Sequence, residues 1–364
     1  MFLKAFSFQG IRNLVDSSLQ LNPKLNIITG NNGAGKSSLL ESICLLTTGR
    51  SFRASKYENI INYNSQQFTL FGQTDTDVKL GLGYEQATNK KTIKINQEKI
   101  NSLSHLASIY PTQILSPESY HMIDSGPSER RKFIDWLLFH VEHQYSDLWK
   151  SYMNTLNQRN ALLKSSNLQY VKNQINVWDD QLDKYGLLIT RYRSNLIEKL
   201  SVCFKQIIES LNLTFADNVS LSLHLGYSGD LKDKLKQNLE ADFKKGYTGF
   251  GAHKSDIKIL VNKLSAKENL SRGQKKILIN LFFLTQTILL KQKTEKNSLF
   301  IIDDFNSELD DYHQKLLLEQ LLMQKNVQIF ISCLQENPLN WLKKRYNSAS
   351  MFHVEHGKVS AVTE

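Results

Sequence analysis

The sequence predicts an α/β fold in which one chain forms a mixed sheet, an antiparallel β subdomain and an inserted all-helical domain. Three observations lead to this expectation. Gly30–Ser37 is a glycine-rich loop between a strand-like and a helix-like segment. Residues 68–100 alternate apolar and polar side chains, as half-buried strands do, and residues 128–213 repeat apolar side chains with a helical period and contain no proline. We therefore expect residues 1–115 and 220–364 to form a split head, and residues 116–219 to form a helical insertion.

The first element is the loop Gly30–Ser37, which matches the phosphate-loop pattern G-x-x-x-x-G-K-S/T. Leu25–Thr29 predicts a short buried strand before it, and a helix is expected from Lys36 to about Thr47. Backbone N–H groups of such a loop and the helix dipole favour a bound triphosphate. The residues expected to bind ATP here are Gly30, Asn31, Asn32, Gly33, Ala34, Gly35, Lys36, Ser37 and Ser38. Lys36 is expected to reach the β- and γ-phosphates, and Ser37 to bind Mg²⁺.

Antiparallel strands surround this loop in the first hundred residues. Strands are predicted near Leu3–Phe8 and Ser18–Leu21, and the turn Gly10–Leu14 between them is expected close to the phosphate loop. Phe68–Tyr84 predicts a hairpin, and Ile93–Ile100 a further short strand pair.

Composition limits the class of protein. The 364 residues carry a net charge of +10, which favours a polyanionic partner such as nucleic acid. The three cysteines lie far apart, which fits a reducing compartment, and the N-terminus lacks the pattern of a signal peptide. The most apolar run, Ile277–Leu290, is too short and too polar for a membrane span. We expect a cytoplasmic protein without a membrane partner.

A second apolar strand, Ser298–Ile302, ends at two aspartates and predicts the missing half of the nucleotide site. Asp303 is the expected Mg²⁺ partner, held through water, and Asp304 is expected to position the attacking water. The alternative interpretation of paired aspartates at a strand end is a helix cap or a solvated loop. The site would then be split, with its two halves on either side of the helical insertion.

The segment Leu270–Gln274 resembles the ABC-ATPase signature, usually Leu-Ser-Gly-Gly-Gln. The resemblance implies an ABC-ATPase head in which this segment caps the γ-phosphate bound by a second subunit, so that ATP holds a homodimer together. The residues carried over are Ser271, Arg272, Gly273 and Gln274 for the signature, Ser307 and Asp310 for the D-loop, and Gln113 for the catalytic glutamine that senses Mg²⁺ and water.

Two positions depart from that class. Asp304 stands where most members have Glu, and its shorter side chain predicts slow hydrolysis. Ser332-Cys333 follows the expected strand Gln328–Ile331 where the class has a switch histidine. Both departures favour a timing switch over a fast motor.

The whole set of motifs resembles the RecF family, which is related to the SMC and Rad50 heads. The resemblance rests on Gly10–Leu14, the phosphate loop with Leu39–Glu41, Thr48–Arg53, Gly126–Asp135, Gly251–Asp256, Leu270–Lys276 and Ile302–Asp311. It implies that Arg12 and Asn13 lie near the nucleotide, that ATP drives dimerisation, and that the protein binds gapped or junction DNA. It also implies RecO and RecR as partners in loading RecA. The block Gly251-Ala252-His253-Lys254 departs from the family's usual Gly-Pro-His-Arg.

The DNA contacts are the least specific prediction. The candidate residues are Arg50, Arg53, Lys56, Arg130 and Arg131, with the lysines at 232, 234, 236, 244 and 245 as further possibilities. Sparse aromatics predict binding dominated by the phosphate backbone, with a steep dependence on salt. We expect a slow DNA-dependent ATPase. The alternatives are an SMC/Rad50-like repair clamp with ATP as a non-hydrolysed switch and a transporter-type ABC ATPase, which the long insertion and the absent switch histidine disfavour.

Overall fold

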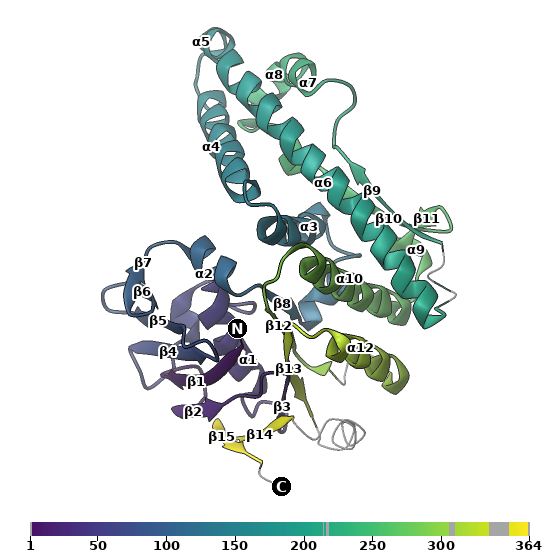
Figure 1. The fold of residues 1–364 in the computed structure, drawn as a ribbon. Coiled ribbons are helices and arrows are strands. Elements are labelled where there is room, and N and C mark those ends of the chain that lie inside the picture. Colours follow the sequence, from purple (N-terminus) through teal and green to yellow (C-terminus); the bar gives the residue numbers. More distant parts are fainter. Residues whose placement is uncertain (1, 214, 216–217, 306–309, 335–348, 363–364) are drawn as a thin grey trace. The chain divides into compact units, whose positions relative to one another are not determined.

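The computed structural model describes residues 2–213, 215, 218–305, 310–334 and 349–362 (Figure 1). The chain divides into two compact units. Unit 1 comprises residues 1–120 and 276–364, and unit 2 comprises residues 121–275. In the described parts of the chain, we find no helix long and apolar enough to span a bilayer.

Unit 1 contains two six-stranded sheets. The antiparallel sheet has the order β2-β1-β4-β5-β6-β7, and the mixed sheet has the order β15-β14-β3-β13-β12-β8. The strands of the first are β1 (Leu3–Gln9), β2 (Ser17–Gln20), β4 (Gln67–Thr74), β5 (Lys79–Glu85), β6 (Lys90–Ile95) and β7 (Glu98–Ile100). The strands of the second are β3 (Leu25–Thr29), β8 (Thr112–Leu115), β12 (Ser298–Ile302), β13 (Val327–Cys333), β14 (Ser350–Glu355) and β15 (Lys358–Ala361).

Five strands of the mixed sheet, β14, β3, β13, β12 and β8, run parallel, so their carboxyl ends lie at one edge. β13 separates β3 from β12. Each of β3, β12 and β13 is buried along its whole length, which explains why their sequences are continuously apolar or neutral rather than alternating. The short Leu25–Thr29 and Ser298–Ile302 segments therefore form strands at the predicted positions.

Helix α1 (Lys36–Thr48) belongs to the core that joins the two sheets. Leu39, Leu40, Ile43 and the neighbouring apolar side chains of α1 belong to one cluster with strand residues of both sheets. The helix ends at Gly49, whose left-handed backbone (φ 66°) allows its N–H to bond to the carbonyl of Leu45. The other helical elements assigned to this unit are η1 (Tyr57–Ile60), α2 (Leu103–Ile109) and α12 (Asp311–Met323), while η2 (Pro117–His121) and α10 (Arg272–Lys293) extend across the division.

Unit 2 is built on the 36-residue helix α6 (Asn176–Leu211), which runs alongside α4 (Tyr145–Leu163) (Figure 1). Leu182, Ile189 and Leu196 are buried on one face of α6 at the helical period that the sequence predicted. The remaining elements are α3 (Pro127–Val141), α5 (Leu168–Gln174), β9 (Val219–His224), α7 (Leu231–Gln237), α8 (Leu239–Lys245), η4 (Ala252–Lys254), β10 (Asp256–Val261), β11 (Leu264–Ser265) and α9 (Ala266–Asn269).

The second domain boundary differs from the prediction. Residues 220–275, which we expected in the head, belong to unit 2 with the helices. The reason is packing: β9 and β10 pair with each other, β9 packs on α6 and β10 on α3. The charged segment that follows β9 forms two short helices, α7 and α8, which meet at Asn238.

A buried ionic cluster ties α4, α6 and α8 together in unit 2. The Arg159 guanidinium donates to Asp179 (2.6 Å), Asp242 (2.8 Å) and the Thr248 hydroxyl (2.9 Å), and all four side chains are buried. Burial raises the pKa of Asp179 while the Arg159 charge lowers it. The arginine is therefore needed to keep the two carboxylates inside the fold.

We predict that Arg159→Met destabilises unit 2 by about 3–5 kcal/mol, because it leaves two buried carboxylates without their shared cation. Trp136, Trp149 and Trp178 lie in unit 2, so urea unfolding followed by tryptophan fluorescence reports on this change. The matched control is Lys172→Met, which removes an exposed ion pair with Glu240 and should shift the midpoint little. Equal shifts for the two variants would contradict the assigned role of the buried cluster.

Candidate nucleotide site

The glycine loop has the geometry that its sequence predicts. It follows β3 at the carboxyl edge of the sheet and leads into α1 at Lys36. Gly30 has φ 147°, and a β-carbon there would lie 2.3 Å from the carbonyl oxygen of Val354. Gly35 has φ 120°, and a β-carbon there would lie 2.8 Å from Leu14 Cδ2. Glycine is therefore required at both positions by backbone conformation and by space.

Lys36 is held inside this loop. Its Nζ donates to the carbonyl oxygens of Gly30 (2.8 Å) and Asn31 (2.9 Å). Burial lowers the pKa of the Lys36 ammonium, and the carboxylates of Asp304 and Asp303 act in the opposite direction. The loop thus presents a cation among backbone groups at a helix N-terminus, a setting suited to phosphate.

Asp303 joins three segments that are far apart in the sequence. Its Oδ1 accepts hydrogen bonds from Ser37 Oγ (2.9 Å) and Ser332 Oγ (2.7 Å). Burial raises the pKa of the Asp303 carboxyl, while the bonds from Ser332 and Ser37 and the charge of Arg53 lower it. Ser332 Oγ in turn accepts from the backbone N–H of Asp304 (2.8 Å). The predicted Mg²⁺ partners Ser37 and Asp303 are therefore in direct contact.

Arg12 and Asn13 lie beside the loop, where the sequence predicted them. The Arg12 guanidinium forms a two-pronged pair with Glu41 of α1, at 2.9 Å and 3.0 Å, and the Glu41 side chain is fully buried. Asn13 Nδ2 donates to the Gly33 carbonyl (3.2 Å), and Asn13 Oδ1 accepts from Ser38 Oγ (3.1 Å). The turn at residues 10–14 therefore supports the loop from the antiparallel sheet.

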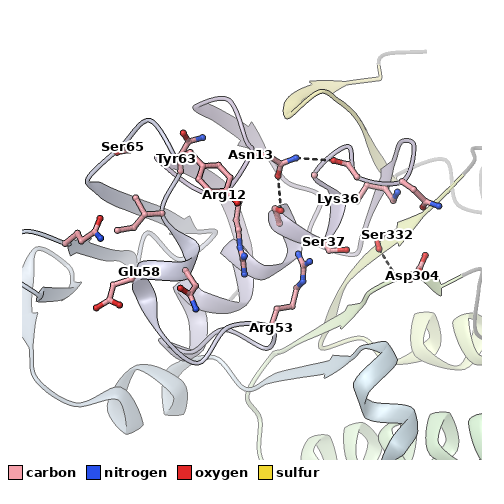
Figure 2. A pocket seen from close by; sticks show the side chains of 18 residues that line it. Arg12, Asn13, Lys36, Ser37, Arg53, Glu58, Tyr63, Ser65, Asp304 and Ser332 are labelled. Atoms are coloured by element: carbon pink, nitrogen blue, oxygen red, sulfur yellow. Dashed lines mark hydrogen bonds between the residues drawn. The ribbon is translucent and has the colours of Figure 1, made fainter.

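These side chains surround a cavity of about 860 Å³ (Figure 2). The size is within the range of ligand pockets that enclose most of a small molecule. The lining residues are Arg12, Asn13, Asn32, Gly33, Gly35, Lys36, Ser37, Ser38, Arg53, Glu58, Asn59, Ile61, Asn62, Tyr63, Ser65, Gln86, Asp304 and Ser332. Figure 2 shows Lys36, Ser332 and Asp304 at one end of the cavity, and Glu58, Tyr63 and Ser65 at the other.

The residues fit a magnesium ion with a triphosphate. Mg²⁺ prefers oxygen ligands, keeps several waters and is usually bound through one or two carboxylates plus substrate phosphates. Ser37 and Asp303 supply a hydroxyl and a carboxylate at the mouth of the phosphate loop. Among the described residues there is no cluster of three or more His, Cys, Asp or Glu side chains that would hold a metal alone.

Arg53 is a cavity residue that the sequence did not assign to the nucleotide. We expected it to contact DNA, but it lines the nucleotide cavity, and Figure 2 shows it near Ser37. Its charge also acts on Asp303. The predicted basic run at residues 50–56 is therefore divided, with Arg53 on the nucleotide side.

The arginines at 130 and 131 also differ from the expected DNA contacts. Arg130 pairs with Asp256 at 2.8 Å and 3.0 Å and donates to the carbonyl of Ser125 (2.7 Å). Arg131 donates to the carbonyl of Ser255 (2.7 Å). Both side chains therefore hold α3 against the start of β10.

Gln113 lies away from the cavity and does not have the place predicted for a catalytic glutamine. It pairs with Phe300 in the sheet register, whereas Leu115 pairs with Ile302 at the carboxyl edge. Its buried amide donates to Gln286 Oε1 (3.0 Å) and accepts from Thr287, both on α10. The side chain is two residues too early in β8 to reach the nucleotide edge of the sheet.

The other predicted motifs have clear local structures. Ser271 and Gln274 form a reciprocal cap at the start of α10: Ser271 N–H donates to Gln274 Oε1 (3.0 Å), and Gln274 N–H donates to Ser271 Oγ (3.3 Å). Arg272 and Gly273 are exposed in the first turn. Asp310 caps α12 by accepting from His313 N–H (3.0 Å). Ser307 lies outside the described residues.

Sequence reasoning missed the far wall of the cavity. Glu58, Asn59, Asn62, Tyr63 and Ser65 line it, and Tyr63 is 99% exposed. The bridge between Ile11 and Ile61 brings this wall beside the turn that carries Arg12. The available signal was the polar, tyrosine- and asparagine-rich segment 57–65 between a predicted helix and a predicted hairpin.

Comparisons with known proteins agree with this fold. The family described as "RecF/RecN/SMC N terminal domain" matches residues 2–359. The chain is 35% identical over 376 residues to "DNA replication and repair protein RecF" of Hahella chejuensis, covering 100% of both chains. It is 37% identical over 366 residues to the protein of the same name from Shewanella frigidimarina, again covering 100% of both.

Solved structures give the same class. One, described as "Structure of the recombination mediator protein RecF-ATP in RecFOR pathway", superposes with a TM-score of 0.84 at 28% identity and covers 100% of this chain and 98% of that chain. An Smc head bound to a ScpA domain shares the fold, with a TM-score of 0.59 at 15% identity, 100% of this chain and 98% of that chain being covered.

The fold and the split phosphate site define an ABC-type ATPase head of the SMC class with a helical insert. Within that class, the chain belongs to the RecF family.

We predict opposite effects of Asp303→Asn on stability and on Mg²⁺ binding. Because the pKa of Asp303 is raised in the folded protein, its ionised form opposes folding at neutral pH, and a neutral amide should raise the melting temperature without ligand. The same change should weaken Mg²⁺-dependent ATP binding by roughly 10- to 100-fold. Thermal melts with and without MgATP measure both effects, and unchanged Mg²⁺ dependence would contradict the assignment.

Proposed function

We propose that this chain is a slow ATPase whose ATP-bound form dimerises and binds gapped or junction DNA in recombinational repair. The observation that carries the proposal is the contact between Ser37 of the phosphate loop and Asp303 of β12, at the edge of the 860 Å³ cavity. This hydrogen bond joins two residues that are 266 positions apart in the sequence, and each belongs to one half of the proposed magnesium-triphosphate site.

Each group at the site has a role in phosphate chemistry. Lys36, Arg12 and Arg53 supply positive charge around the place for the phosphates. Bound Mg²⁺ would neutralise charge on the β- and γ-phosphates, and Ser37 and Asp303 would hold it. Asp304 lines the cavity at the carboxyl edge and would accept a proton from, or orient, the attacking water. The polar wall at residues 58–65 has the amides and the tyrosine ring suited to a base.

Dimerisation through ATP follows from the signature segment. Ser271, Arg272 and Gly273 are exposed at the N-terminus of the 22-residue helix α10, where backbone N–H groups favour an anion. In a two-fold dimer each copy would offer this helix end to the γ-phosphate held by the other. Asp310 of the D-loop is expected at the same interface.

DNA binding and partners rest on the family. The RecF-ATP structure described above is of a recombination mediator protein in the RecFOR pathway. The net charge of +10 fits a nucleic-acid partner. We therefore propose gapped or junction duplex as the substrate, RecO and RecR as partners, RecA loading as the outcome, and the cytoplasm as the location.

A second candidate is a clamp that uses ATP as a non-hydrolysed switch. Asp304 favours it, because the side chain is shorter than the glutamate of the ABC class and its backbone is left-handed (φ 61°). In that case ATP binding would close the dimer and dissociation of ATP, rather than hydrolysis, would open it. A transporter-type ATPase is disfavoured by the full-length match to RecF proteins.

We predict that Lys36→Arg abolishes nucleotide-dependent dimerisation under either candidate. The bulkier guanidinium cannot replace an ammonium that is only 7% exposed within the loop. ATP affinity should fall by roughly 10- to 100-fold, the value of one charge-assisted hydrogen bond. Sedimentation with ATP measures the dimer, and Lys358→Arg on exposed β15 is the control. ATP-dependent dimers in the Lys36 variant would refute the proposal.

We predict that Asp304→Asn separates the two candidates. If Asp304 positions the attacking water, ATP-bound dimers of the variant should persist at least roughly tenfold longer than those of the wild type. The matched control is Asp77→Asn, because Asp77 is exposed in a turn with the same left-handed φ of 61°. An unchanged dimer lifetime would exclude a role of Asp304 in ATP hydrolysis and would support the clamp that uses ATP as a non-hydrolysed switch.

A further inference from the structure

A second, smaller cavity lies in unit 1 where the C-terminus of α1 meets η1 and the start of α2. Its volume is about 260 Å³, below the usual range for whole small molecules. Arg50, Ser51, Ser55, Lys56 and Tyr57 supply its polar wall. It shares no lining residue with the nucleotide cavity.

The wall of this basic cavity is cationic. Arg50 and Lys56 are both exposed, and no acidic side chain lines the cavity. Within the described ranges, neither cation takes part in an ion pair. Burial raises the pKa of Tyr57, and the charge of Arg50, which lines the same cavity, lowers it. Two cations with serine hydroxyls at this size suit one phosphate group.

Ser51 connects the basic cavity to the nucleotide cavity. Its side chain lines the former, donates to the buried carboxylate of Glu41, and accepts from the backbone N–H of Arg53 (2.9 Å). Glu41 holds the Arg12 guanidinium with its two oxygens. Arg12 and Arg53 both line the nucleotide cavity. Through Glu41 and Ser51, the backbone of the loop at residues 50–54 is therefore linked to the Arg12 side chain.

We propose that the basic cavity binds one backbone phosphate of duplex DNA, and that this contact changes ATP affinity through Ser51 and Glu41. The inference rests on the proposed function, which supplies DNA as the source of the phosphate. A phosphate drawn between Arg50 and Lys56 shifts the loop that carries Ser51 and Arg53. Because coupling between two sites is reciprocal, ATP strengthens DNA binding by the same factor by which DNA strengthens ATP binding.

The first test compares the double variant Arg50→Ala/Lys56→Ala with the charge-matched control Lys94→Ala/Lys358→Ala, whose two lysines are exposed on β6 and β15. Affinity for gapped duplex is measured with ATP at several salt concentrations, using the full chain. For the cavity variant, the slope of log affinity against log salt should become shallower by about one unit relative to the control. Its ATP affinity without DNA should remain within about twofold of the control. Equal slopes for the two variants would overturn the site.

The second test addresses the coupling. Ser51→Ala keeps both cations but removes the link to Glu41, so DNA should no longer raise ATP affinity, while salt-dependent DNA binding without ATP persists. If DNA raises ATP affinity equally in Ser51→Ala and wild type, the coupling is overturned.

Inorganic phosphate distinguishes the source of the ligand and separates this inference from the proposed function. If phosphate alone raises ATP affinity in the wild type but not in Arg50→Ala/Lys56→Ala, the cavity takes a free anion and the DNA assignment is wrong. If the wild type fails to bind gapped duplex, the proposed function fails. If the wild type binds duplex and the cavity variant matches its control, only this inference fails.

Discussion

The nucleotide site depends on one buried carboxylate, Asp303. The parallel sheet brings the ends of β3, β12 and β13 to one edge, and Asp303 bonds there to Ser37 from the first segment and Ser332 from the last. β13 lies between the other two strands, so its serine completes the junction. Burial without these two hydroxyls would leave an ionised carboxylate largely unsatisfied. The nucleotide site therefore exists only when residues hundreds apart in the chain have folded together.

Local patterns in the sequence were sufficient to predict the strands and the helix start that form this edge of the sheet. The predicted strand Leu25–Thr29 and the start of α1 at Lys36 agree with the structure, as does the strand Ser298–Ile302. These segments could be predicted because each depends on residues close together in the sequence. A continuous apolar run is typical of a buried parallel strand, and glycines are typical of a loop with left-handed backbone. The match to residues 2–359 of the RecF/RecN/SMC family confirms the class that these motifs predicted.

The differences at Arg130 and Gln113 share one physical cause, which is side-chain pairing over long sequence separations. Nothing near Arg130 indicates Asp256, which is 126 residues away, and nothing near Gln113 indicates α10. The boundary at residue 220 failed in the same way, because β9 and β10 are ordinary half-buried strands whose partner face is supplied by distant helices. Alternation identifies a strand but not the element that covers it.

Several arginines of this chain form ion pairs inside the fold, so the net charge of +10 cannot be assigned to the surface as a whole. Arg159 and Arg193 are buried on carboxylates and carbonyls, Arg12 and Arg130 pair with Glu41 and Asp256, and Arg53 faces the nucleotide. The planar guanidinium suits such multiple bonds, whereas a lysine ammonium keeps its hydration at the surface. A cluster of arginines in the sequence therefore overstates the positive charge available at the surface, because much of that charge stabilises the interior. The cations that remain for a phosphate backbone must be identified by their exposure and by the cavity they line, and Arg50 with Lys56 meets both conditions.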